Sequence, residues 1–137
     1  MSLIKSIGNK KVNLDFNKNF ITVFSEKINI GDLQFINQTL KDLHPSDIAN
    51  LIENLSYDTR IKLIEIESFN IAPEIFIELN ESVQSEVLHL ISLDSISEII
   101  KRLESDDAVS ILENLELDKK NLILDKLPPK DRFLLEE

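Results

Sequence analysis

The sequence contains no cysteine, which excludes disulfide bonds, thiolate catalysis and cysteine-ligated zinc, and fits a reducing compartment. Only two of the 137 residues are glycine and four are proline, so the turns must be short. No apolar run approaches the roughly 20 residues that a membrane-spanning helix needs, and we expect neither a span nor a secretion signal in this chain. Leu and Ile dominate the 42 % of residues that are apolar. With so little glycine, this composition predicts a single, all-helical folded domain, with room for a small N-terminal attachment.

Negative charge is concentrated in one part of the chain. Residues 1–42 carry six lysines and four acids, whereas residues 43–137 carry nine basic residues against 21 acids, a balance of −12. Such a field repels phosphate backbones and anionic lipid headgroups, and it attracts cations. We therefore expect no nucleic-acid partner for the acidic segment.

Apolar residues recur with a period of twelve from Leu43 onward. Seven of the eight residues at this spacing are apolar, and the exception is Glu67. The positions eight and nine residues after each of these anchors are apolar in all seven units, and both fall on one helical face. They are Leu51, Leu63, Ile75, Val87, Ile99, Ile111 and Ile123, each followed by Ile52, Ile64, Phe76, Leu88, Ile100, Leu112 or Leu124.

The polar residues of each unit fit the start of a helix. Ser56 and Ser92 directly follow an anchor, where a side-chain oxygen can cap the first backbone N–H groups. Each unit thus predicts a helix of roughly nine residues and a turn of about three, too short to be stable alone. Stacked units can share a continuous core, as in solenoids. The period predicts an all-α superhelix of short helices, and it does not determine the hand.

The segment before the period carries two further helix candidates. Residues 19–29, NFITVFSEKIN, suit a helix or a strand, and we predict a helix. Gly31 interrupts this element, and Gly31 or Asp32 can cap a second helix over residues 33–43.

One stretch matches part of a calcium loop. Asp15, Asn17, Asn19 and Glu26 occupy the spacing of positions 1, 3, 5 and 12 of an EF-hand. The sixth position is Phe20, where the sharp turn needs glycine, and the rest of the loop is apolar. A polar turn before an apolar segment is the better interpretation.

The two histidines lack the companions that catalysis or zinc binding requires. Neither His44 nor His89 has a second ligand three or four residues away. We expect His44 to cap a helix before Pro45, and His89, between Leu88 and Leu90, to be structural. Since the chain also lacks a glycine-rich phosphate loop and a serine–histidine pair in recognisable context, we expect no enzymatic activity.

The carboxylates remain as candidates. Individually they are explained as caps, first-turn acids or solvated faces. Their surplus costs self-repulsion, which divalent cations or a basic partner would relieve. In LESDDAVSILENL, Asp106 occupies a slot where other units carry Asp, Asn or Ser, whereas Asp107 corresponds to Thr59 and Lys119 in other units. Asp107 is therefore the less expected member of the pair.

Residues 31–55, GDLQFINQTLKDLHPSDIANLIENL, carry a recognisable pattern. A G-D-L start followed by L-H-P-x-D-[IV]-A-x-L-[IL]-E-x-L resembles the N-terminal cytosolic domain of MgtE-type magnesium transporters. The later units, including IAPEIFIELNES, are similar to the same domain. The resemblance covers residues 31–137, and we predict that residues 1–30 form a helical N-terminal extension.

The resemblance implies a right-handed superhelix that senses cytosolic Mg²⁺. In that family the domain precedes paired CBS modules and a five-helix membrane pore, both absent from this chain, and the bacterial transporter is a homodimer. Mg²⁺ at carboxylate contacts between this domain and the CBS region favours the closed pore. The implied location is the cytoplasmic side of the bacterial inner membrane.

The resemblance also implies which residues contact the metal. Glu74 in APEI and Asp106 in SDDA match metal-contacting acids of the family, and Asp107 is an adjacent candidate. Ser110 stands where another acid can follow one turn later. The implied ligand is regulatory Mg²⁺. We expect the isolated domain to bind it weakly, and Glu74 and Asp106 to help bind it only when a CBS partner is present.

A second family shares part of this pattern. The middle domain of the flagellar motor switch protein FliG also has a His-Pro dipeptide leading into short helices, which would imply a metal-independent protein-interaction module. Here its Glu-His-Pro-Gln setting is replaced by LHPSD, and the regular period favours the transporter domain.

Overall fold

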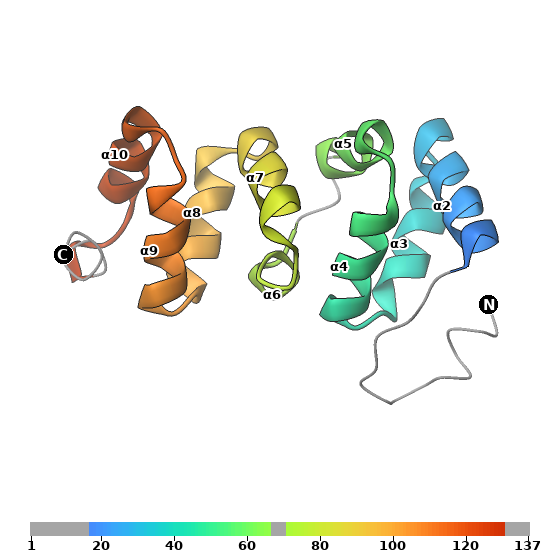
Figure 1. Cartoon of the computed structure of the whole chain (residues 1–137), viewed down its shortest axis with the longest axis horizontal. Helices are drawn as coiled ribbons and strands as arrows, with labels where there is room; N and C mark the ends of the chain where they lie inside the picture. The colour runs from blue at the N-terminus through green and yellow to red at the C-terminus, as the bar shows by residue number, and fades with distance from the viewer. Residues whose placement is uncertain (1–16, 67–70, 131–137) are drawn as a thin grey trace. The chain divides into compact units, whose positions relative to one another are not determined.

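The computed structural model describes residues 17–66 and 71–130, and residues 1–16, 67–70 and 131–137 lie outside this description. Every regular element in the described part is a helix, which confirms the all-α prediction. With the labels of Figure 1, the helices are α2 (Lys18–Ile30), α3 (Leu33–Lys41), α4 (Pro45–Asn54), α5 (Tyr57–Glu65), α6 (Pro73–Phe76), α7 (Glu81–Leu90), α8 (Leu93–Arg102), α9 (Ser105–Glu113) and α10 (Leu117–Lys126). In residues 17–66 and 71–130, none of these helices is long and apolar enough to cross a bilayer.

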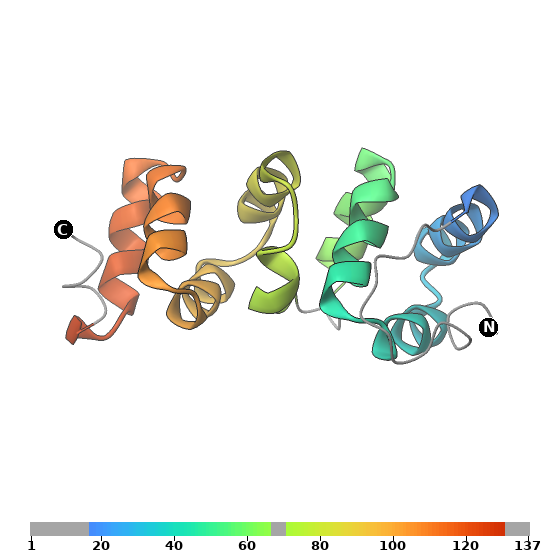
Figure 2. The ribbon, with the colours of Figure 1, turned by 60° about the horizontal axis from the view of Figure 1, so that its bottom comes forward.

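The helices form two compact units, Met1–Asn80 and Glu81–Glu137. In the first, α2 packs against α3 and α5, and α4 packs against α6. In the second, α8 packs against both α9 and α10, and Figure 2 shows α8 next to α9. The superhelix, its right hand and the boundary after residue 30 stay predictions.

The periodic apolar positions form the core of both units. All fourteen residues at the eighth and ninth positions are buried, with exposed fractions from 0 % to 7 %. Four anchors, Leu43, Leu55, Leu79 and Leu127, are buried as well. Because a buried Leu, Ile or Val side chain contributes roughly 1.5–3 kcal/mol by leaving water, this face dominates the stability of short helices that are unstable alone.

The helix starts follow the same period. Six helices, α4, α5, α7, α8, α9 and α10, begin two residues after an anchor. Ser56 and Ser92 act as the predicted N-caps, accepting from the backbone N–H groups of Thr59 and Ser95 at 3.3 Å and 3.1 Å. His44 caps α4 through its ring, since the Ser46 N–H donates to His44 Nδ1 at 3.3 Å.

The unit that starts at Glu67 breaks the pattern, so the prediction of a nine-residue helix there is wrong. Its helix, α6, has only four residues and begins at Pro73. Proline has no N–H to donate and disfavours helical backbone in the residue before it, and Ala72 is accordingly extended, with φ −75° and ψ 150°. Ile75 and Phe76 are nevertheless buried, so the unit still contributes its two core residues.

The segment before the period forms the two predicted helices. Phe24 of α2 is fully buried and lies between two aromatic rings, with centroid distances of 6.2 Å to Phe20 and 6.5 Å to Phe35. Gly31 ends α2 in the left-handed conformation, with φ 76°, which glycine adopts without steric cost. Asp32 begins α3 by accepting from the Phe35 N–H at 3.1 Å.

Arg60 of α5 supports the end of the preceding helix. Its side chain is 8 % exposed, and its Nη1 donates to the carbonyl oxygens of Leu55 at 2.9 Å and Ile52 at 3.3 Å. A buried cation at this position pairs with the negative end of α4, whose last carbonyls have no partner within the helix.

Candidate functional site

Glu74 lies in the first turn of the short helix α6. Its side chain is exposed, whereas the next two residues, Ile75 and Phe76, point into the core. Pro73 fixes the start of this helix, so the carboxylate of Glu74 is carried by a backbone that proline has made rigid.

Asp106 and Asp107 lie in the first turn of α9, and both are exposed. Glu104 is the N-cap residue of this helix, but its side chain makes no capping hydrogen bond. The two carboxylates therefore lie near first-turn N–H groups that no cap side chain satisfies, at the positive end of the helix dipole. This position explains a first-turn acid without a metal, as the repeat already indicated for Asp106.

The structure brings only two of the three predicted metal-contacting residues together. Asp106 and Asp107 are neighbours on α9, whereas Glu74 belongs to the other compact unit. Among the residues described, no group of three or more His, Cys, Asp or Glu side chains is placed to hold a metal ion. Any Mg²⁺ at these carboxylates needs further ligands, from water or from a partner.

Asp94 occupies the same slot of the repeat as Asp106 but is held by a lysine. Lys126 Nζ at the end of α10 lies 2.9 Å from Asp94 Oδ1 at the start of α8. The hydrogen bond and charge of Lys126 lower the pKa of the Asp94 carboxyl below its ordinary value. This pair could not be predicted from the sequence, because nothing in the period indicates that residues 32 positions apart meet.

The calcium-loop candidate does not form a loop. Asn17 is the N-cap of α2, and its side chain accepts from the Phe20 N–H at 2.7 Å. Asn19 and Glu26 lie within α2, while Asp15 is outside the described residues. Since a helix replaces the loop that would wrap around the ion, the polar-turn interpretation holds.

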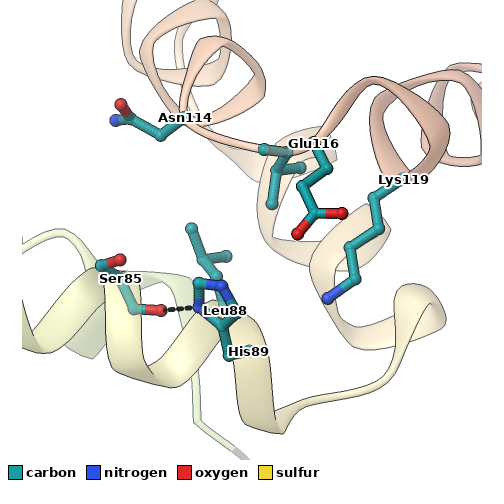
Figure 3. A pocket seen from close by; sticks show the side chains of 7 residues that line it. Ser85, Leu88, His89, Asn114, Glu116 and Lys119 are labelled. Carbon is teal, nitrogen blue, oxygen red and sulfur yellow. Dashed lines mark hydrogen bonds between the residues drawn. The ribbon is translucent and has the colours of Figure 1, made fainter.

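His89 lines a small cavity within the second unit (Figure 3). The cavity has a volume of about 20 Å³ and lies between the last turns of α7 and the turn that joins α9 to α10. The exposed His89 ring is tied to its own helix, because its Nδ1 donates to the backbone carbonyl of Ser85 at 2.7 Å. The other walls of the cavity include Asn114, Glu116 and Lys119.

These observations define a helical repeat domain whose periodic face is buried and whose acids are displayed at helix starts. The comparison with protein families matches residues 43–137 to the MgtE intracellular N domain. The chain belongs to this family, which confirms the resemblance to the N-terminal domain of MgtE-type magnesium transporters. A comparison with curated proteins found no match.

Proposed function

We propose that this chain is the regulatory intracellular domain of a magnesium transporter, and that it responds to cytosolic Mg²⁺. The observation that carries the proposal is the family match over residues 43–137. The proposal assigns no chemical reaction to the domain. It favours the transporter over the motor-switch alternative, because the family match covers the His-Pro start of the period as well as the later units.

The proposed contact residues are Glu74, Asp106 and Asp107. All three are exposed, so a cation can reach them without the cost of opening the core. Mg²⁺ retains several of its waters and needs only one or two carboxylates per site, so isolated acids suffice if a partner supplies the rest. A charge balance of −12 over residues 43–137 raises the local concentration of divalent cations around them.

The proposed partners are CBS modules of the same polypeptide and the second subunit of a homodimer, on the cytoplasmic side of the bacterial inner membrane. At high Mg²⁺ the ion would bridge the carboxylates of this domain and those of the CBS region, which favours the closed pore. At low Mg²⁺ the facing acids repel each other and the domain moves away. The equilibrium shifts because Mg²⁺ binds the two states with different affinity.

The test is a Mg²⁺ titration of the natural polypeptide that carries this domain, followed by limited proteolysis. We expect Glu74→Gln and Asp106→Asn each to raise the Mg²⁺ concentration that gives half-maximal protection by about tenfold, the equivalent of roughly 1.4 kcal/mol. Each variant removes a charged ligand while keeping nearly the same side-chain shape.

Two acids serve as matched controls. Asp118 occupies the slot of Asp106 on the next helix, α10, and Glu78 is an exposed acid near Glu74. Asp118→Asn and Glu78→Gln remove the same charge without touching a proposed ligand. If all four variants shift the titration equally, the effect is that of total charge, and the assignment of Glu74 and Asp106 fails.

A further inference from the structure

The cavity beside His89 is large enough for an ion or a water molecule. Its volume of about 20 Å³ exceeds the roughly 10–15 Å³ that a cavity needs to hold one water. The walls are polar on two sides, with the His89 ring from α7 and the side chains of Glu116 and Lys119 from the start of α10 (Figure 3).

The His89 ring has the hydrogen bond that is typical of metal-binding histidines. A carbonyl oxygen only accepts, so the 2.7 Å contact with the Ser85 carbonyl places the proton on His89 Nδ1. The lone pair of the neutral ring is then on Nε2. Metal-binding histidines commonly donate their other ring N–H to a carbonyl or carboxylate, which fixes the tautomer and the orientation of the ring.

Glu116 supplies a carboxylate to the same cavity. It is the N-cap residue of α10, yet its side chain makes no hydrogen bond to the helix. In Figure 3 the side chains of Glu116 and Lys119 both extend toward the His89 ring. The Lys119 ammonium repels a cation that enters the cavity.

We propose that His89 Nε2 and the Glu116 carboxylate form a two-ligand site for a divalent transition metal of the Zn²⁺ and Ni²⁺ class. Imidazole suits these metals, whereas Mg²⁺ prefers oxygen ligands, so Mg²⁺ does not compete effectively. Water completes the coordination, because the described residues provide no third His, Cys, Asp or Glu ligand. The site is independent of the proposed Mg²⁺ contacts at Glu74 and Asp106.

The test is calorimetric titration of the 137-residue chain with Ni²⁺ in a large excess of Mg²⁺. We expect one ion to bind, His89→Ala to abolish binding and Glu116→Gln to weaken it about tenfold. Lys119→Met should tighten binding by about threefold, since it removes a like charge near the ion. The control is His44→Ala, which removes the other histidine and should leave the affinity unchanged.

Zn²⁺ provides a second measurement, because it is diamagnetic. On addition of Zn²⁺, the ring resonances of His89 should shift and those of His44 should not. The proposal is overturned if Ni²⁺ binds His89→Ala as tightly as the parent chain, if Lys119→Met weakens binding, or if excess Mg²⁺ displaces the metal. None of these outcomes depends on the Mg²⁺ response at Glu74 and Asp106, so the two proposals fail separately.

Discussion

Two leucines on α10 offer a matched test of the periodic core. Leu124 is 6 % exposed and Leu122 is 50 % exposed, although they lie two residues apart on the same helix. Leu124→Ala removes buried apolar surface and leaves a cavity, which generally lowers the free energy of unfolding by about 2–5 kcal/mol. Because α10 is the last described helix, its neighbours can relax around the cavity, and we expect a loss of about 3 kcal/mol. Leu122→Ala loses about half of a burial term of roughly 2 kcal/mol, and the higher helix propensity of alanine returns a few tenths.

The expected difference in the free energy of unfolding is therefore about 2 kcal/mol. Urea unfolding followed by far-ultraviolet circular dichroism measures it, and with a slope near 2 kcal/mol per molar urea the midpoints should differ by about 1 M. Both substitutions change the helix propensity equally, so this term cancels in the comparison. Equal destabilisation by the two variants, with unchanged slopes, would refute the assignment of the ninth position of each unit to the core.

Three further substitutions test single interactions. Ser97 Oγ is buried and has no hydrogen-bond partner among the described residues, so Ser97→Ala should leave stability unchanged or raise it by up to about 1 kcal/mol in thermal unfolding. Arg60→Met removes both side-chain bonds to the end of α4 and should cost about 2 kcal/mol, whereas Arg102→Met, at an exposed arginine, should cost less than about 0.5 kcal/mol in the same assay. Because Lys126 lowers the folded-state pKa of Asp94, their ion pair contributes stability above the ordinary carboxyl pKa and loses it as the pH falls through the folded-state value. Lys126→Met should raise the Asp94 pKa in an NMR titration, and an unchanged midpoint would rule out the pair in solution.

The fold could be predicted from the sequence because every unit buries the same face of its helix. Each unit therefore has apolar residues at its eighth and ninth positions, and this is why all fourteen core residues at these positions were predicted correctly. The exception at α6 has an equally local cause. Pro73 lies inside the expected helix and restricts Ala72, so applying the proline rule to that unit would have predicted the shorter helix. A period describes the average unit, and a single proline overrides it.

The site was harder to predict, because Asp94, Asp106 and Asp118 are equivalent in the repeat. Each lies in the first turn of its helix, so local sequence gives all three the same helix-start chemistry. The difference comes from tertiary packing: α10 packs against α8 and brings Lys126 to Asp94, whereas no lysine or arginine of the described chain pairs with Asp106.

A cation attracted only by first-turn acids would therefore respond to Asp106 and Asp118 alike, and less to Asp94. A cation held between this domain and a partner would distinguish Asp106 from Asp118, because only one of them would face that partner's ligands. The Asp118→Asn control therefore also tests where the selectivity for Asp106 arises. If Asp106→Asn shifts the Mg²⁺ titration and Asp118→Asn does not, the selectivity comes from the partner surface and not from the repeat.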